Sequence, residues 1–233
     1  MIGWGFHEKM GLERGVAMVT LEFDKECNRQ LDRVIESRRS VRSFTDDVPP
    51  RELIEQVLQA GLLAPYASAA IGSEELFRRF IVIEKGSDAM AAAADTIRRN
   101  IKGAWEIIGK QAAGGGVVPP FAKRLKAIAD GAPIGFEDVP YYIVVAELKG
   151  VPPVEQRSLA HVLENMWLKA TALGLGFRLI SATTQQEGDP EFCALLGIPP
   201  GKFGLDGCCI GYPTEVPPPT KRPALEEVTA WLS

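Results

Sequence analysis

Two clusters of basic residues are the first groups in this sequence that could bind a ligand. The first cluster, within five residues, consists of Arg38, Arg39, Ser40 and Arg42. The second, after a proline-rich stretch near the C-terminus, consists of Lys221 and Arg222. A guanidinium presents a planar fork of donors that matches phosphate oxygens, so each cluster could hold a phosphate. The alternatives are a helix C-terminus whose cations complement the helix dipole, and a solvated basic pair. Considered separately, the first cluster is better explained as a helix C-terminus, and the second as a solvated pair, than as phosphate sites.

Two segments of small residues could bring their backbone close to a flat ligand. The first follows a predicted helix and reads Pro65, Tyr66, Ala67, Ser68, Ala69 and Ala70. The second begins as Leu173-Gly174-Leu175-Gly176 and continues through a predicted strand into Ser181-Ala182-Thr183-Thr184. A plain loop and a helix cap explain the two segments equally well. The glycine pair is not a dinucleotide-binding fingerprint, because it follows a helix, whereas that fingerprint follows a strand.

Protein-borne catalytic groups are hard to find in this chain. His7 and His161 are the only histidines, and neither has a cysteine or carboxylate at metal-ligand spacing. We interpret His161 as a packed or interfacial residue rather than a base. The sequence also lacks a G-x-S-x-G elbow, a P-loop and the context of a Cys/His dyad. We therefore expect no metal site and no catalytic side chain, and an enzyme of this kind takes its chemistry from a cofactor.

Helices and strands must position these segments, and the spacing of apolar residues predicts where they lie. Helical spacing predicts four helices, at 28–38, 49–64, 153–173 and 189–197. Short, largely apolar runs predict four strands, at 80–83, 141–146, 177–181 and 207–211, and the first of them is rich in β-branched residues. Residues 86–131 have a helical but poorly regular pattern, with Ser87 as a cap and a glycine break at 114–116. Weaker patterns predict an extended piece at 16–23 and an amphipathic turn at 225–231. Because helices and strands interleave, we expect a mixed α and β domain around one sheet.

The composition indicates one folded domain. The chain has 233 residues, of which 46% are hydrophobic and 24% charged, and these values exclude wholesale disorder. With 26 Lys+Arg against 30 Asp+Glu the net charge is −4, which argues against nucleic-acid binding through a basic surface. The four cysteines form no C-x-x-C pair, so we expect reduced thiols and a cytoplasmic protein. No segment reaches the ~20 apolar residues of a membrane span, and the charged N-terminus does not fit a signal peptide.

Five segments, taken in order, resemble a known family. They are ESRRSVRSF at 36–44, PPRELIEQVLQAGLLAPYASAA at 49–70, RRFIVIE at 78–84, HVLENMWLKATALGLGFRLIS at 161–181 and CIGYPTEVPPPTKRPALEEV at 209–228. The set resembles the nitroreductase family of FMN-dependent oxidoreductases over residues 30–230. The resemblance implies an α+β fold with a central mixed or antiparallel sheet flanked by helices. It also implies a homodimer with FMN at the subunit interface and a C-terminal tail that extends onto the partner.

The same resemblance assigns residues to the flavin. The residues implied for its phosphate and ribityl chain are Arg38, Arg39, Ser40, Lys221 and Arg222. Arg42 would reach the pyrimidine edge of the ring, where a donor favours the anionic reduced form. The residues that would line the ring from the other subunit are Pro65, Tyr66, Ala67, Ser68 and Ala69. The backbone that would face flavin N5 and O4 belongs to Ile180, Ser181 and Ala182. The two basic clusters would then share one ligand.

The implied activity passes reducing equivalents from NAD(P)H to a nitroaromatic, quinone or similar small aromatic acceptor by a ping-pong mechanism. Residues 86–131, with Trp105 and Phe121, would form a substrate-side cover within a single domain at 28–233, after an extension at 1–27 whose role stays open. The loop at 66–73 departs from the family, because it lacks the Asn that commonly contacts the flavin. Two alternatives follow: a flavin-binding carrier or sensor without efficient turnover, and a flavin enzyme of different chemistry such as reductive dehalogenation.

Overall fold

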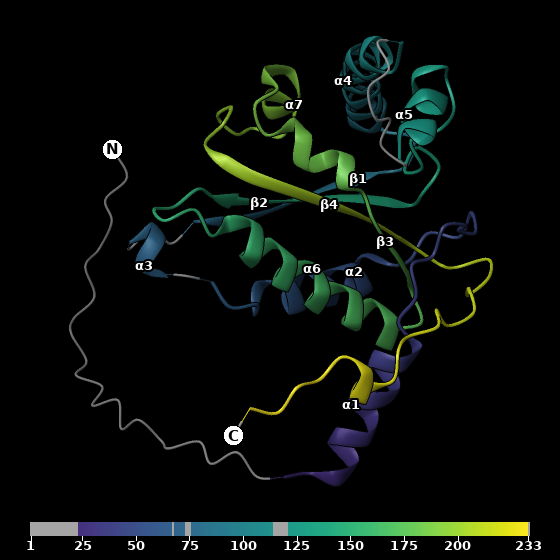
Figure 1. The fold of residues 1–233 in the computed structure, drawn as a ribbon, viewed down its shortest axis with the longest axis vertical. Helices are drawn as coiled ribbons and strands as arrows, with labels where there is room; N and C mark the ends of the chain where they lie inside the picture. Colours follow the sequence, from purple (N-terminus) through teal and green to yellow (C-terminus); the bar gives the residue numbers. More distant parts are fainter. Residues whose placement is uncertain (1–22, 67, 73–75, 114–120, 233) are drawn as a thin grey trace, which may run out of the picture.

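The computed structural model describes residues 23–66, 68–72, 76–113 and 121–232, and at its centre lies a four-stranded sheet (Figure 1). The strands are β1 (Arg78–Glu84), β2 (Tyr141–Leu148), β3 (Gly176–Leu179) and β4 (Phe203–Gly211). Their order across the sheet is β1-β2-β4-β3, and every pairing is antiparallel. The predicted α+β class with an antiparallel sheet is therefore confirmed.

Helices cover both faces of the sheet. On one face lie α2 (Arg51–Leu62) and α6 (Glu155–Ala172); over the other lie α4 (Asp88–Ala113), α5 (Ala122–Ala129) and α7 (Pro190–Leu195). Strand β2 belongs to both cores, because Ile143 and Val145 pack on the α2–α6 side and Tyr142 and Val144 on the other. A strand buried on both faces has a continuous apolar sequence, and this explains why 141–146 shows no polar alternation.

The remaining short elements refine the predicted boundaries. Helix α1 (Lys25–Ser37) starts earlier than expected, because the Asp24 side chain accepts hydrogen bonds from the amides of Glu26 (2.8 Å) and Cys27 (3.0 Å). The other short elements are α3 (Ser68–Ile71) and the 3-10 helices η1 (Ser181–Gln186) and η2 (Leu225–Glu227). The extended piece expected at 16–23 lies, apart from Phe23, outside the described residues, as does the glycine break at 114–116.

The helical character expected for residues 86–131 is confirmed, because this segment contains α4 and α5. Helix α4 is more regular than expected, one uninterrupted helix of 26 residues, because Met90, Ile97 and Ile101 keep a single face in the core. The cap at Ser87 is present, since its Oγ accepts a hydrogen bond from the Met90 amide at 3.1 Å. The third strand ends at Leu179, and Ser181 begins η1 instead of continuing the strand.

A buried ion pair connects β1, β2 and the end of α2. Arg78 and Glu147 pair with side chains only 1% and 3% exposed. The Arg78 guanidinium also donates to the carbonyl of Gly61 (2.9 Å), in the last turn of α2, and to that of Ala64 (3.1 Å), just beyond the helix. Helix ends leave carbonyls short of intrahelical donors, and here Arg78 supplies donors in addition to the Ala64 amide, which donates to the Gly61 carbonyl at 3.1 Å. The pair therefore fixes how the chain leaves α2 on its way to Pro65.

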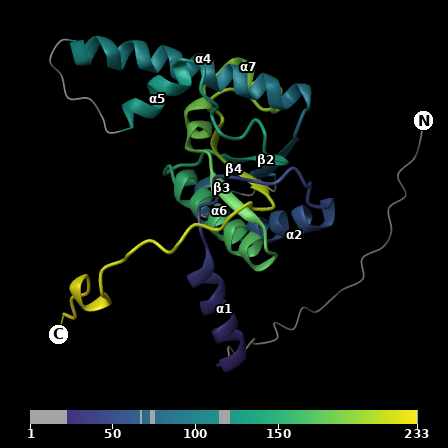
Figure 2. The same cartoon turned by 90° about the vertical axis from the view of Figure 1, so that its right-hand side faces the viewer.

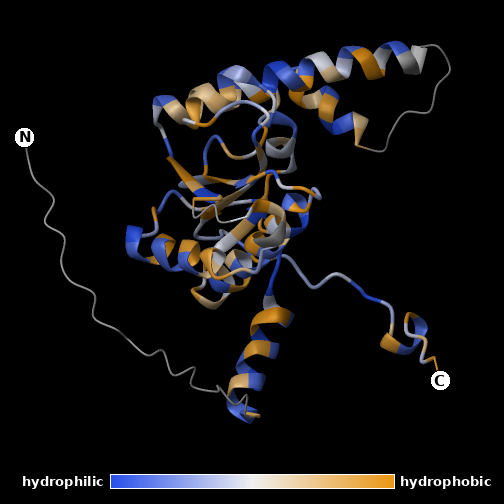
Figure 3. Ribbon diagram, turned by 90° about the vertical axis from the view of Figure 1, so that its left-hand side faces the viewer, coloured by the Kyte–Doolittle hydropathy of each residue, from blue (hydrophilic) through white to orange (hydrophobic). Residues whose placement is uncertain are grey.

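Both α1 and the C-terminal tail extend away from the body of the domain (Figures 1 and 2). Leu225, Val228 and Trp231 at the end of the tail are exposed, Trp231 by 93%. Figure 3 shows apolar residues on both of these outlying segments. Whether the tail packs on a partner subunit stays a prediction. None of the helices among the described residues has the length and apolar character that crossing a membrane requires.

Candidate functional site

The segment that follows α1 brings the first basic cluster beside β3. Ser40 pairs in parallel with Phe177, and the Val41 amide donates to the Phe177 carbonyl at 3.0 Å. A few residues later, Phe44 pairs with Pro213, at the point where the C-terminal tail leaves β4. Segment 40–44 thus joins the strand that leads to Ile180 with the start of the tail that carries the second basic cluster.

The two glycines between α6 and β3 have separate roles. Gly174 has φ +73° and ends α6 in the left-handed conformation that glycine adopts at low cost. A Cβ at Gly176 would lie 2.9 Å from Val41 Cγ1 and 3.0 Å from Phe44 Cε1. The close approach of segment 40–44 to β3 therefore depends on the missing side chain at Gly176.

A basic hollow of about 550 Å³ forms where the two clusters meet. Its polar lining is Arg38, Arg39, Ser40, Thr220, Arg222 and one carboxylate, Glu36. Lys221 is exposed and does not line this hollow. The structure thus brings the first cluster together with Arg222, although nearly the whole domain separates them in sequence.

The two arginines at the start of the cluster are held in different ways. Arg38 forms an ion pair with Glu164 at 3.2 Å, and its guanidinium lies 4.3 Å from the centre of the Trp167 ring. Trp167 Nε1 in turn donates to the Arg39 carbonyl at 3.1 Å, which anchors the segment to α6. Arg39 Nη1 donates to the Arg38 carbonyl at 2.8 Å, but its buried Nε has no hydrogen-bond partner among the described residues. A buried donor left without a partner costs free energy, so an anion at this position would satisfy it.

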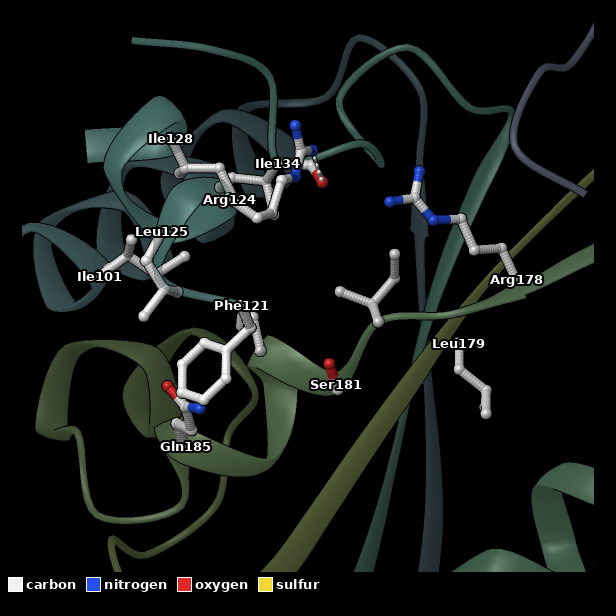
Figure 4. A pocket seen from close by; sticks show the side chains of 12 residues that line it. Ile101, Phe121, Arg124, Leu125, Ile128, Ile134, Arg178, Leu179, Ser181 and Gln185 are labelled. Atoms are coloured by element: carbon white, nitrogen blue, oxygen red, sulfur yellow. Dashed lines mark hydrogen bonds between the residues drawn. The ribbon is translucent and has the colours of Figure 1, made fainter. Parts of the chain in front are cut away.

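A second, more apolar hollow of about 460 Å³ lies at the end of β3 (Figure 4). It contains the predicted residues Ile180, Ser181 and Ala182, with Phe121, Leu125 and Ile128 from the α5 region opposite. Two arginines, Arg124 and Arg178, also line it.

Residues 180–182 are fixed to the sheet at both ends. The Ile180 amide donates to the Gly207 carbonyl of β4 at 2.8 Å. Just beyond, the Thr183 hydroxyl is 2.7 Å from the hydroxyl of Tyr142 in a fully buried pair. Burial raises the pKa of Tyr142, so its phenol stays protonated and can take part in this hydrogen bond. A short backbone strip is therefore presented to the hollow on a rigid support.

The loop between α5 and β2 forms one wall of the apolar hollow, and Glu137 organises it. The Glu137 carboxylate accepts hydrogen bonds from the amides of Ile134 (2.8 Å), Gly135 (2.7 Å) and Phe136 (3.1 Å). It also pairs with Arg98 at 3.0 Å. Partial burial acts to raise the pKa of Glu137, but the hydrogen bonds to its charged form outweigh burial, and the pKa is lowered from its ordinary value of 4.5.

We expect Glu137→Gln to lower the free energy of unfolding at neutral pH by about 1–2 kcal/mol. The amide keeps only one of the two acceptor oxygens, so the hydrogen bonds at the other position are lost and the remaining ones are no longer charge-assisted. A carboxyl whose pKa is lower in the folded state stabilises the protein above its unfolded pKa and loses that effect as the pH falls through the folded one. The difference between variant and wild type should thus be largest above pH 5 and shrink below pH 4.5. Urea unfolding at several pH values measures it, and a constant difference across this range would contradict the assignment.

The remaining predicted residues lie elsewhere on the surface. Arg42 is exposed and lines a third hollow of about 240 Å³ beside Gly135 and Glu137. Pro65 and Tyr66 line a fourth hollow, of about 280 Å³, with the exposed His161. Ala67 falls outside the described residues, and Ser68 and Ala69 form the first turn of α3, which corrects the expectation of a plain loop.

Arg124 and Arg178 line the apolar hollow but were not among the residues predicted for the site. Arg178 carried a signal, because it is the only charged residue in the apolar run from Phe177 to Ile180. A charged side chain within a strand that is otherwise apolar has to reach polar partners or water. Arg124 carried no such signal, because lysines and arginines are common on an exposed helix such as α5.

Comparison with known proteins decides the family. The model of the nitroreductase family matches residues 35–212, which includes the first basic cluster and all four strands. The chain belongs to the nitroreductase family. The expected resemblance is thereby confirmed for most of the chain. No curated protein matches the chain at a significant level.

Solved structures of this family share the fold at low sequence identity. A nitroreductase with bound FMN from Bacteroides fragilis NCTC 9343 has 21% identity and a TM-score of 0.61, over 87% of this chain and 98% of its own. A BluB-like flavoprotein from Clostridium difficile 630 has 21% identity and a TM-score of 0.65, over 87% and 99%. An iodotyrosine deiodinase bound to FMN and 3-iodo-L-tyrosine has 19% identity and a TM-score of 0.60, over 84% and 96%. The same fold thus occurs in relatives with different names and ligands.

Proposed function

We propose that this nitroreductase-family protein is an FMN-dependent oxidoreductase that transfers electrons from a nicotinamide to a small aromatic acceptor. The observation that carries the proposal is the basic hollow, in which Arg222 of the tail lines the same space as Arg38, Arg39 and Ser40. Separately, each cluster had a simple structural explanation. Their meeting in one hollow supports a shared anionic ligand.

The residues of the basic hollow fit a flavin phosphate. Three guanidiniums and two hydroxyls line it, against the single carboxylate of Glu36. The buried Nε of Arg39 needs an acceptor that the described protein does not provide. A phosphate has several oxygens that accept charge-assisted hydrogen bonds, so it can satisfy this donor and others at once. Lys221, next to Arg222 in the tail, is exposed. It would join the phosphate site if the tail moved.

The ring would then extend from the basic hollow along β3 toward residues 180–182. In this proposal Ser40 and the anchored backbone of Ser181 and Ala182 orient the ring, and Arg42 supplies positive charge at its pyrimidine edge. When bound, FMN supplies electron transfer through its N5. Segment 65–69 would come from a second copy of the chain, and the part of the tail beyond Arg222 would pack on that copy, so that the protein would act as a homodimer. The exposed apolar residues of the tail support this arrangement, because large apolar side chains left in water favour association.

The donor and the acceptor would use the apolar hollow in turn, which is a ping-pong scheme. NAD(P)H is the proposed donor. The walls of the hollow, from Phe121 to Ile128 on one side and Ile180 on the other, would exclude water around a flat substrate. None of the chain's own side chains has to accept or donate a proton in this scheme, so the proposed role of the protein is binding and orientation.

We expect freshly purified protein to be yellow, with flavin absorption that disappears under NADH or NADPH and returns on addition of a nitroaromatic or quinone. A visible spectrum before and after each addition measures this. Protein that stays colourless after incubation with FMN and gel filtration would contradict the proposal.

Two alternatives give distinct results in the same experiment. Yellow protein whose flavin neither nicotinamide reduces would indicate a flavin carrier or sensor, which the missing Asn at 66–73 favours. Loss of iodide from an iodinated phenol by chemically reduced protein, without turnover of nitroaromatics, would indicate reductive dehalogenation. The likeness to a deiodinase bound to an iodinated aromatic supports including that substrate.

A further inference from the structure

Two arginines in the apolar hollow have no part in the function proposed above. Arg124 of α5 and Arg178 of β3 both line the hollow that contains Ser181 and Ala182 (Figure 4). Neither forms an ion pair with a carboxylate among the described residues. The carboxylate of Glu137 acts electrostatically on Arg178, but Arg98 and three backbone amides already bind it. Two positive charges thus remain without a counter-ion in a hollow whose other lining residues are uncharged.

Both guanidiniums are held in place by one short strip of backbone. Arg124 Nη2 donates to the carbonyls of Pro133 (2.6 Å) and Ile134 (3.0 Å), and Arg178 Nη1 donates to the next carbonyl, Gly135, at 3.2 Å. Because the three carbonyls are consecutive, the two guanidiniums lie at the same wall of the hollow. Each keeps further N–H donors beyond those that these bonds use.

The position of Arg178 depends on the residue beneath it. Gly135 has φ +113°, and a Cβ there would lie 2.9 Å from both Cζ and Nη2 of Arg178. Any side chain at position 135 would therefore push the guanidinium away from the backbone. A planar group set flat against a glycine and fixed by hydrogen bonds is a pre-organised donor rather than a freely moving surface side chain.

The electrostatics favour an added anion. Burial, and with it the positive charges of Arg124 and Arg42, lowers the pKa of the half-buried Arg178 guanidinium, which remains charged. Guanidiniums of like charge in a partly desolvated space repel one another, and an anion bound between them removes that cost. In the remaining lining, Leu125, Ile128 and Ile134 are apolar, and the polar side chains of Ser181 and Gln185 carry no charge.

We propose that Arg124 and Arg178 bind a carboxylate, or a comparable anionic oxygen group, on the ring of the electron acceptor. The preferred acceptors are accordingly aromatic acids. A volume of about 460 Å³ holds a single ring with one acidic group. The apolar side chains would contact the ring, and the two guanidiniums would donate hydrogen bonds to the acidic group. This inference rests on the proposed function, which assigns the acceptor to this hollow.

The test compares two probes of nearly equal shape, 4-nitrobenzoate and the neutral 4-nitrobenzamide, on the flavin-loaded protein without nicotinamide. Calorimetry or the change in flavin fluorescence gives the two dissociation constants. We expect wild type to bind the benzoate about tenfold or more tightly than the amide, and the ratio to fall as salt is added. Turnover with each probe is then a second readout.

Arg178→Gln and Arg124→Gln should each weaken benzoate binding by about tenfold to a hundredfold, the value of one charge-assisted contact, and leave amide binding nearly unchanged. Arg178→Lys should recover part of the preference, because it keeps the charge and loses the fork. The matched control is Lys123→Gln, which removes a neighbouring exposed charge of α5 that does not line the hollow. Circular dichroism checks that each variant folds. Because Arg124 is exposed, its variant should fold, so it tests the proposal even if the Arg178 variants fail to fold.

Equal affinity for the two probes in wild type would overturn the proposal, as would equal loss of both probes in the Gln variants. If the variants instead weaken NADH or NADPH and not the benzoate, the arginines bind phosphates of the nicotinamide donor and the assignment to the acceptor is wrong. Flavin content from the visible spectrum tests the proposed function separately. A yellow, reducible protein without preference for the acid would refute this inference alone.

Discussion

Replacing Arg39 and Arg222 together by alanine will lower the affinity for FMN by about 10²- to 10⁴-fold. Each change removes a charge-assisted contact of about 1.5–3 kcal/mol to the phosphate, and every 1.4 kcal/mol is a factor of ten. These two residues are better targets than Arg38, because Arg38 is already bound to Glu164 and stacked on Trp167. Its replacement would disturb the protein as well as the ligand site.

Flavin titration followed by gel filtration measures the loss, and the double variant should leave the column colourless. Arg51→Ala is the matched control, since it removes an exposed guanidinium that pairs with Glu55 on the surface of α2. The control should retain flavin as wild type does. A double variant that keeps stoichiometric FMN would refute the phosphate assignment and with it the main support for the proposed function.

Arg78→Ala will destabilise the folded protein by about 3–5 kcal/mol, because it leaves the carboxylate of Glu147 buried without its counter-ion. It also removes hydrogen bonds to the carbonyls of Gly61 and Ala64. For a chain of this length the loss corresponds to a decrease in Tm of roughly 6–20 °C. Urea unfolding monitored by tryptophan fluorescence measures it directly.

Two further variants test the reason for this loss. Arg79→Ala removes the adjacent arginine of β1, which is exposed and contacts the Phe203 ring at 5.1 Å, and should cost less than about 1 kcal/mol. The pair Arg78→Met with Glu147→Leu removes both charges and should recover much of the stability, since a buried ion pair is often replaceable by apolar residues. If this pair is no more stable than Arg78→Ala alone, the loss comes from the missing hydrogen bonds of the guanidinium rather than from the unpaired charge of Glu147.

Arg78 and Arg39 show how the same kind of side chain can serve different purposes. Arg78 has a carboxylate, a hydroxyl and backbone carbonyls as partners, so every charge is compensated within the domain. Arg39 has backbone carbonyls alone, and one buried nitrogen remains without a partner among the described residues. The first pattern is that of a structural ion pair, and the second is that of a site prepared for an external anion.

The sequence alone located nearly every helix and strand. Most elements begin and end within a few residues of their predicted positions, namely strands β1, β2 and β4 and helices α2, α6 and α7. This is because the spacing of apolar residues along an element shows which of its faces is buried. The sequence also predicted a glycine end for α6, at Gly174 or Gly176, since a left-handed residue at a helix end is usually glycine, and the structure places that end at Gly174. The resemblance to the nitroreductase family likewise came from motifs in order along the chain and is confirmed over residues 35–212.

What only the tertiary structure decided was which distant residues meet. The contact of Ser40 with Phe177, the entry of Arg222 into the hollow of Arg39, and the alignment of Arg124 and Arg178 on one strip of carbonyls all join segments far apart in sequence. The spacing of apolar residues along one element does not predict such pairs, because it shows which face of the element is buried but not which other segment covers that face. A charged residue such as Arg124 has the same local pattern on a plain surface as in a site. Its role depends on the potential and the shape that other segments create around it, and these exist only once the chain has folded.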